Sequence, residues 1–518
     1  MNVNWLLLAP ELCVLGAALV VLGFDFAFPR ARKETLGLVA TAGTLAALAV
    51  LLALRHEHGS TFGQLLVADS MAFIFGAIIL CAAVVVCLAS VHFAPSVTDN
   101  VAEYYALLLL SVLGLMLTAA AGDLLTAFLA IELSTISLYA LAGYVRRDAR
   151  SAEAGLKYLL LGIVASGLLI YGTSLVYGSF GTTRFRAIGA QLASQPWAMS
   201  PAAMAGLMLV IAGFGFKITA APFHMWAPDV YQGAPTTVTA FLSVASKAAG
   251  FAILMRVLLG PFMSARPEIA AAVALACALS LLIGNLSAIP QTNIKRMLAY
   301  SGIAHAGYVL IGIAALSQAG AAASIFYLVQ YVFANAGAFL VAAAVAQATG
   351  KEEIADYAGL AQRNPPLAFA MLLLLLSLGG IPPLAGFWAK VYVFVEAARS
   401  GLWWLVLLGA LLSVVALYYY LMVVKQMYIF PAGQREPVRV KWTTGLAIGI
   451  CTAAVVIIGY PRPYVQAAQR AAADAIFRQP HAVRLVVRRT SQQPIAGDVH
   501  TAGPTRSAPP ASPPAGVH

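Results

Sequence analysis

Four ionisable side chains lie within long apolar stretches of this sequence, where a charge is hard to accommodate. They are Glu132, Lys217, Lys247 and Lys390. A charged side chain at the centre of a bilayer costs about 2.5–3.5 kcal/mol on insertion scales, so these residues are expected to face a polar interior and to carry function. The alternatives are a lysine that reaches to the membrane surface and a glutamate that makes only a structural hydrogen bond.

A buried lysine beside a carboxylate is suited to proton transfer. Burial destabilises the protonated ammonium and a nearby carboxylate stabilises it, so a lysine with a movable glutamate partner can hold and release a proton. We expect Glu132 and Lys217 to form such a pair, with Lys247 next along the path. His224 and His305 titrate nearest neutral pH, so each either bridges proton steps or makes structural hydrogen bonds.

Prolines and glycines interrupt the apolar stretches beside two of the lysines. Pro222 follows Lys217 by five residues and crowds the carbonyl of Ile218. The segment Gly379–Gly386 (GGIPPLAG) precedes Lys390. Broken backbone at membrane depth is tolerated where protein or a wet cavity satisfies it, so both breaks favour a polar path over a simple kink.

The apolar stretches that carry these residues are long enough to cross a membrane, which takes about 20 residues per helix. We predict an all-α polytopic membrane protein with about fourteen transmembrane helices, the seventh and twelfth of them broken. The stretches are 5–24, 35–54, 70–92, 104–121, 123–144, 154–177, 202–221, 236–258, 268–288, 297–316, 321–347, 366–398, 402–428 and 443–460. Residues 1–460 are expected to form one transmembrane domain, and residues 461–518 a basic, Pro- and Ala-rich tail that is disordered because it cannot form a packed core.

The composition excludes several classes of protein. Hydrophobic residues make up 61% of the chain and charged residues 10%, against about a quarter in soluble domains. The net charge of +11 does not indicate nucleic-acid binding, because the basic residues lie mostly at the ends of apolar stretches. The five cysteines lie inside apolar stretches without metal-ligand spacing, and no nucleotide loop or haem motif is present. We therefore expect no cofactor or metal in this chain.

The distribution of Lys and Arg predicts the orientation in the membrane. With the N-terminus on the periplasmic side, fifteen basic residues lie in inner loops and six in outer loops, among them Arg256. Seven more lie in the tail, which an even number of helices would place outside. Long terminal segments follow the rule poorly, so the side of the tail stays open.

An internal repeat accompanies the two breaks. The segment Pro222–Tyr231 (PFHMWAPDVY) resembles Pro383–Tyr392 (PLAGFWAKVY), about 161 residues further along the chain. Five predicted helices separate the two segments, and an odd number places them in opposite orientations. Inverted five-helix repeats joined by broken helices are typical of ion transporters.

Three motifs resemble the antiporter-like subunits of respiratory complex I, the proton-pumping NADH:quinone oxidoreductase, and of Mrp-type cation/proton antiporters. They are Phe216–Thr236 (FKITAAPFHMWAPDVYQGAPT), Leu298–Tyr308 (LAYSGIAHAGY) and Gly380–Phe387 (GIPPLAGF). In that family a glutamate of helix five and lysines of helices seven and eight belong to a proton path, which implies this role for Glu132, Lys217 and Lys247. In helix twelve, Lys390 resembles the subunit N branch, whereas subunit M has Glu there.

The resemblance implies a subunit of a bacterial inner-membrane translocase, in which quinone reduction by NADH elsewhere in the complex drives proton movement. It implies that NADH, flavin, iron–sulfur clusters and quinone bind to other subunits. The expected partners are other membrane subunits of complex I, including neighbouring antiporter-like subunits, and the lipid bilayer. The alternative is a subunit of an Mrp-type antiporter, which is not an enzyme. A purely structural scaffold is disfavoured by the four buried ionisable residues.

Overall fold

The computed structural model describes residues 3–25, 27, 33–195, 199–432 and 436–460, together with positions 470 and 474. These residues are largely helical, with one small antiparallel sheet formed by β1 (Gly59–Thr61) and β2 (Leu66–Ala68). The tail predicted for residues 461–518 lies outside the described residues except at positions 470 and 474.

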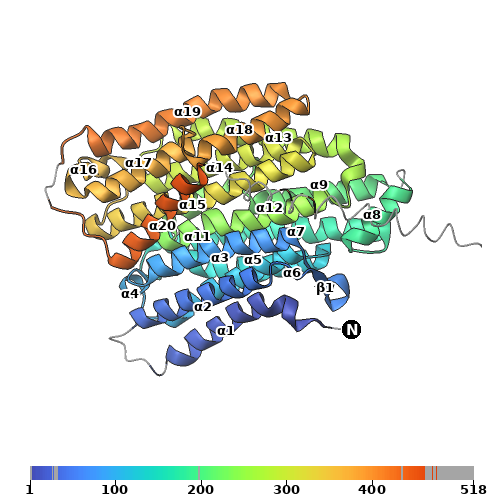
Figure 1. Cartoon of the computed structure of the whole chain (residues 1–518), viewed down its shortest axis with the longest axis horizontal. Coiled ribbons are helices and arrows are strands. Elements are labelled where there is room, and N and C mark those ends of the chain that lie inside the picture. Colours follow the sequence, from blue (N-terminus) through green and yellow to red (C-terminus); the bar gives the residue numbers. More distant parts are fainter. Residues whose placement is uncertain are drawn as a thin grey trace, which may run out of the picture. The chain divides into compact units, whose positions relative to one another are not determined.

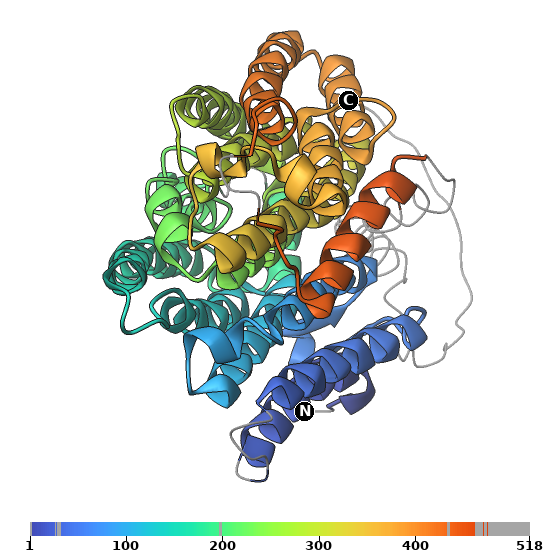
Figure 2. The same ribbon diagram turned by 90° about the vertical axis from the view of Figure 1, so that its left-hand side faces the viewer.

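The long helices lie side by side along one main direction (Figure 1), and Figure 2 looks along them. The short helices α4 and α16 lie at one end of the bundle, and β1 and α8 lie at the other (Figure 1). The helices are α1 (Ala9–Asp25), α2 (Glu34–Ala53), α3 (Ser70–Ser90), α4 (Ala94–Val97), α5 (Val101–Ala120), α6 (Leu124–Ala142), α7 (Ala149–Phe180), α8 (Phe185–Ser194), α9 (Pro201–Lys217), α10 (Trp226–Gly233), α11 (Thr236–Phe241), α12 (Lys247–Leu258), α13 (Arg266–Ala288), α14 (Ile294–Ala314), α15 (Gln318–Thr349), α16 (Leu360–Arg363), α17 (Pro365–Gly379), α18 (Ala385–Arg399), α19 (Trp403–Tyr428) and α20 (Trp442–Ile458).

Within the described residues, eleven helical segments are long and apolar enough to cross a membrane. Three shorter apolar helices, α9, α17 and α20, accompany them. The prediction of an all-α polytopic membrane protein is therefore confirmed, whereas the number of about fourteen crossings stays a prediction.

Polar residues and glycines set the ends of these helices. Asp123 caps α6 by accepting hydrogen bonds from two backbone N–H groups, and Asn293 caps α14 in the same way. Gly350 ends α15 in the left-handed conformation that glycine adopts without steric strain. These residues thus pair backbone N–H groups at two helix starts and let the chain turn at the end of α15.

The backbone departs from α-helix beside each of the three lysines. α9 ends at Lys217, and the segment 218–225 connects it to α10. A π-helical turn, Leu242–Ser246, directly precedes Lys247. α17 ends at Gly379, Gly380 has a positive φ of 86°, and α18 begins at Ala385, five residues before Lys390. These irregular segments free backbone carbonyls near the lysines.

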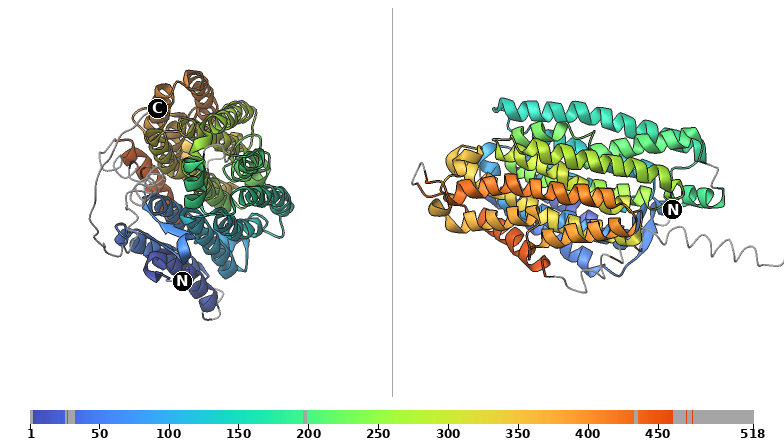
Figure 3. Two further views of the ribbon diagram at one scale, coloured as in Figure 1. Left: turned by 90° about the vertical axis from the view of Figure 1, so that its right-hand side faces the viewer. Right: turned by 90° about the horizontal axis from the view of Figure 1, so that it is seen from above.

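The innermost helices carry the candidate path. Every residue from Thr236 to Leu258 is buried, and α14 and α15 are buried along most of their length. α7 lies at the edge of the bundle (Figure 3) and exposes a row of apolar side chains that includes Leu160 and Val164. Figure 2 shows α20 at the side of the bundle, where it packs against α3 and α15.

Candidate functional site

Lys217 and Glu132 are connected through the helix that carries the carboxylate. The Lys217 side chain is 3% exposed, and its Nζ atom donates a 2.6 Å hydrogen bond to Thr135 Oγ1 on α6. Thr135 lies one helical turn after Glu132. Ser166 on α7 donates a hydrogen bond to the Glu132 carboxylate. Among the ion pairs of the described residues, none joins Glu132 directly to Lys217, so the predicted pair is linked indirectly here.

Lys247 is held by α14 and by two tyrosine rings. It is 2% exposed, and its Nζ atom donates a 2.7 Å hydrogen bond to the carbonyl of Gly302 on α14. The rings of Tyr231 and Tyr331 face the ammonium, with centroids 6.0 Å and 5.7 Å from Nζ. Gly250, one turn after Lys247, packs so closely on the Lys217 side chain that an added Cβ would lie 3.4 Å from it. The helix that carries Lys247 thus packs against the Lys217 side chain one turn further along.

His305 lies one turn beyond Gly302 on α14 and bridges two tyrosines. Its Nδ1 atom lies 2.7 Å from the hydroxyl of Tyr327, and its Nε2 atom lies 3.2 Å from the hydroxyl of Tyr420. Tyr420 also shares a hydrogen bond with Ser301, on the turn of α14 that precedes the histidine. Either ring nitrogen can donate or accept, so His305 has the two partners that proton relay requires.

Lys390 ends this series of groups. It is 5% exposed, and its Nζ atom donates to the carbonyl of Gly379, at 2.9 Å, and to Ser413 Oγ, at 2.6 Å. The Tyr308 ring, one turn after His305, has its centroid 4.8 Å from Nζ. Lys390 therefore points into the protein and not towards lipid or headgroups. The helix break supplies one of its acceptors, because Gly379 lies at the end of α17.

His224 does not belong to this series. It lies partly exposed in the connection between α9 and α10, and its buried Nδ1 atom has no hydrogen-bond partner in the described part of the chain. No hydrogen bond between described residues joins His224 to Lys217 or to His305.

We call the set Glu132, Lys217, Lys247, His305 and Lys390 the central row.

Polar sites lie at both ends of the bundle. At the end that carries α16, the carboxylate of Asp229 pairs with Lys157 and Arg296, and Lys295 pairs with Glu352 at 2.8 Å. A polar cavity at the same end is lined in part by Lys295, Glu352 and Thr236. This end corresponds to the inner side of the membrane in the predicted orientation.

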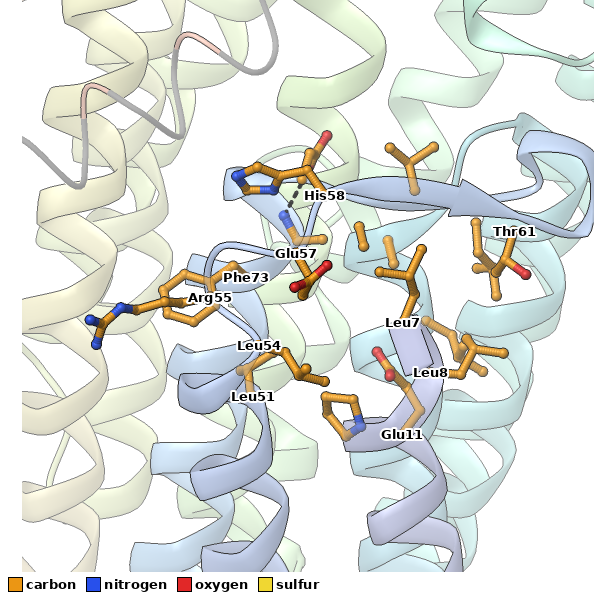
Figure 4. A pocket seen from close by; sticks show the side chains of 18 residues that line it. Leu7, Leu8, Glu11, Leu51, Leu54, Arg55, Glu57, His58, Thr61 and Phe73 are labelled. Carbon is orange, nitrogen blue, oxygen red and sulfur yellow. Dashed lines mark hydrogen bonds between the residues drawn. The ribbon is translucent and has the colours of Figure 1, made fainter. Parts of the chain in front are cut away.

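At the end that carries β1, Asp69 and Arg256 form a buried ion pair with N···O distances of 2.7 and 3.0 Å. Arg256 was predicted to lie in an outer loop, but it lies in α12 and is 1% exposed. Burial alone would raise the pKa of Asp69, but the Arg256 guanidinium and backbone hydrogen bonds hold that pKa below its ordinary value. Figure 4 shows the neighbouring pocket, where Glu11, Glu57 and His58 gather.

The sequence identified the charged members of the central row and missed their partners. Thr135, Gly302 and Ser413 are hydroxyl and glycine residues, which are common in membrane helices for packing reasons. Helical spacing could have identified some of these partners, because Ser301, Gly302 and His305 share one face of α14. Within the described residues, no group of three His, Cys, Asp or Glu side chains is arranged to hold a metal ion.

Known proteins resemble the chain over most of its length. The family model for the transmembrane region of NADH:quinone oxidoreductase and Mrp antiporters matches residues 121–416. NADH-quinone oxidoreductase subunit N of Moorella thermoacetica is 44% identical over 476 residues, covering 90% of this chain and 98% of the relative. Subunit N of Rhodospirillum rubrum is 43% identical, covering 90% of this chain and 96% of the relative.

Solved structures agree with these relatives. A chain of respiratory complex I from Thermus thermophilus with bound aureothin is 33% identical, with a TM-score of 0.70 over 92% of this chain and 98% of that chain. A chain of the Mrp complex from Dietzia sp. has a TM-score of 0.82 over 93% of this chain and 99% of that chain, but at 20% identity it shows a shared fold alone. The chain belongs to the family of NADH-quinone oxidoreductase subunit N.

Proposed function

We propose that protons cross this chain along the central row, from Glu132 through Lys217 and Lys247 to His305 and Lys390. The chain is a proton-translocating membrane subunit of NADH:quinone oxidoreductase and assembles with other membrane subunits of complex I. It takes part in the enzyme without performing the redox chemistry. We propose that it binds no cofactor of its own, and that NADH, flavin, iron–sulfur clusters and quinone are held by other subunits.

One observation carries the proposed path. Three lysines that are at most 5% exposed each donate to an acceptor inside the protein. The neighbouring groups follow at intervals of one helical turn. These intervals separate Thr135 from Glu132 on α6, and Gly302 from His305 and His305 from Tyr308 on α14. A buried ammonium keeps its proton when acceptors or carboxylates approach and releases it when they withdraw. Small movements at the irregular backbone beside each lysine can therefore change its protonation.

The orientation follows from the distribution of basic residues. We propose that the chain lies in the bacterial inner membrane with a periplasmic N-terminus, so that Lys390 is the terminal carrier on the outer side. His224 is proposed to exchange protons with the row near Lys217, from the exposed side of the first helix break.

Deletion of the gene tests the function directly. Membranes that lack this chain should lose NADH-driven proton uptake into inverted vesicles, and a plasmid copy should restore it. The Mrp-type alternative predicts the opposite pattern, in which NADH-driven proton uptake persists and cation/proton exchange is lost. That alternative is less supported, because the relatives from Moorella thermoacetica and Desulforamulus reducens, which are 44% and 42% identical over at least 90% of this chain, are subunit N proteins of NADH-quinone oxidoreductase.

A further inference from the structure

An apolar groove lies between α17 and α20, and Figure 2 shows α20 at the side of the bundle. Its volume is about 780 Å³, within the range of about 300–1,000 Å³ that is typical of ligand sites. Gly445 and Gly449 of α20 keep it open, because no atom lies within 4 Å of a Cβ added to Gly449. Phe369 of α17 and Ile457 of α20 also line it and are 55% and 56% exposed.

The polar side chains that line the groove are already paired with protein. Thr452 Oγ1 donates a 2.9 Å hydrogen bond to the carbonyl of Ile448 in its own helix. The Asn364 amide donates a 2.8 Å hydrogen bond to the carbonyl of Val438, and its Oδ1 atom accepts one from the N–H of Leu367. The groove therefore offers mainly hydrocarbon contacts, which suit an acyl chain better than a polar ligand.

Two cations lie beside the inner end of the groove. Arg439 and Lys441 belong to the segment 436–441, which leads into α20. Burial alternates along this segment, because Val438 is buried and Val440 lines the groove, whereas Arg439 and Lys441 are exposed. Neither cation has an ion pair or a side-chain hydrogen bond with any residue that the structure describes. Both are therefore available to a negatively charged group at this end.

The surroundings of these cations favour an anion at the level of the membrane surface. Arg363 donates a 3.1 Å hydrogen bond to the carbonyl of Glu436, which brings a third cation to the segment beside the exposed Glu436 carboxylate. Trp442 begins α20 and is 63% exposed, and tryptophan is enriched where the bilayer meets water. The positive end of the α20 helix dipole lies at the same place.

The length of the groove separates a lipid from a partner helix. The groove follows α20 from Gly445 to Ile457, which is about 18 Å at 1.5 Å per residue. Half of the hydrocarbon core of a bilayer is about 15 Å thick, whereas a transmembrane helix of another protein would cross about 30 Å. The groove thus matches one acyl chain that enters from the leaflet where the cations lie.

We propose that this groove is a binding site for an anionic phospholipid of the inner leaflet. Arg439 and Lys441 hold the phosphate, and one acyl chain lies along α20 past Phe369 towards Ile457. The cytoplasmic leaflet is the negatively charged one, in agreement with the proposed orientation of the chain. The site is separate from the central row, and the inference does not rest on the proposed proton path.

Photolabelling of the assembled complex tests the site. Complex I is reconstituted in phosphatidylcholine vesicles that contain a minor fraction of phosphatidylglycerol with a diazirine in one acyl chain. After irradiation, mass spectrometry identifies the labelled peptides. Label is expected on α20 between Gly445 and Ile457 and on Phe369 of α17. Phosphatidylcholine that carries the same diazirine, at the same fraction, should label these positions at least fivefold less.

Removal of the cations tests the recognition of the headgroup. Arg439→Gln and Lys441→Gln each remove one charge and leave the groove unchanged. A Lys or Arg near an anionic lipid surface contributes about fivefold in affinity, so each variant should lower phosphatidylglycerol labelling about fivefold below saturation. Labelling by phosphatidylcholine should stay the same. Arg147→Gln is the control, because it removes an exposed charge between α6 and α7 that does not line the groove.

Filling the groove tests the position of the acyl chain. Gly449→Leu places a side chain in the groove without a clash, because nothing lies within 4 Å of the added Cβ. It should lower the label on α20 at least fivefold although both cations remain. Gly178→Leu on α7 is the matched control, since its added Cβ is equally free of contacts, and it should leave the label on α20 unchanged.

Three results would overturn the inference. Equal labelling by the two lipids, unchanged when Arg439 and Lys441 are both replaced by Gln, would show ordinary contact with the bilayer. Labelling of Gly449→Leu at the wild-type level would place the acyl chain elsewhere. Absence of label from α20 in the wild-type complex would show that another subunit covers the groove. Proton pumping is not measured in this test, so the lipid site and the proton path can fail independently.

Discussion

The ammonium of Lys217 donates a 2.6 Å hydrogen bond to the hydroxyl of Thr135, one helical turn from the carboxylate of Glu132. The hydroxyl in turn donates to the carbonyl of Ile131, at 2.6 Å. Thr135 thus fixes the lysine against α6 while leaving Glu132 free to pair with Ser166 on α7.

Replacing Thr135 by Val should therefore impair pumping without altering the shape of the site. A hydrogen bond to a charged group contributes about 1.5–3 kcal/mol, and about 1.4 kcal/mol corresponds to tenfold in an equilibrium. We expect NADH-driven proton uptake into vesicles to fall by about tenfold. Thr135→Ser, which keeps the hydroxyl, is the control and should stay near wild type; equal rates for Val and Ser would show that the bond is not needed.

The charge of Glu132 should matter more than its length. Glu132→Gln keeps the hydrogen bond with Ser166 but cannot titrate, whereas Glu132→Asp titrates with a shorter side chain. We expect pumping by the Gln variant to fall severalfold below that of the Asp variant, measured per assembled complex. Equal activity of the two variants would favour a structural hydrogen bond.

Gly302 should tolerate no side chain. An added Cβ would lie 2.7 Å from Lys247 Nζ, so Gly302→Ala must displace the ammonium from its carbonyl acceptor. We expect at least a fivefold loss of pumping in a complex that still assembles. Gly178→Ala is the matched control in a helix, because nothing lies within 4 Å of its added Cβ. Wild-type pumping by Gly302→Ala would mean that the position of Lys247 is unimportant.

Lys390 should be replaceable only by another titratable group. Lys390→Ala removes the donor to Gly379 and Ser413 and should lower pumping at least fivefold. Lys390→Glu is expected to restore part of the rate, because a carboxylate can also load and release a proton. Quinone reductase activity and proton uptake are measured in the same vesicles. If Lys390→Ala pumps protons at the wild-type rate, Lys390 is not the terminal carrier.

The sequence predicted the membrane helices and the charged residues of the row for a simple physical reason. The charge of a lysine such as Lys247 in an apolar stretch is stabilised only where the side chain faces a polar interior. A single lysine in such a stretch therefore predicts a buried polar site. The same reasoning failed for Arg256, which was counted with the outer loops although it lies near the end of the apolar stretch 236–258. Its partner Asp69 is distant in the sequence, and only the packing of α12 against α3 brings the two together.

The partners of the lysines could not be predicted from single residues. Ser413 and Gly302 resemble many other small residues of membrane helices. Every residue has a backbone carbonyl, so the sequence does not show that the carbonyl of Gly379 accepts a hydrogen bond from a lysine. The indirect link between Lys217 and Glu132 was missed for the same reason, since it depends on which face of α6 meets α9. Spacing along one helix, as in Ser301, Gly302 and His305 on α14, was the usable clue.

The most direct test of the central row is proton pumping by Lys217→Ala in complex I that assembles to the wild-type level. Proton uptake into inverted vesicles is measured against NADH oxidation in the same preparation, with a wild-type plasmid copy as the control. The proposed path predicts that uptake falls at least tenfold while the complex remains intact. Proton uptake at the wild-type rate in the assembled variant would contradict the path.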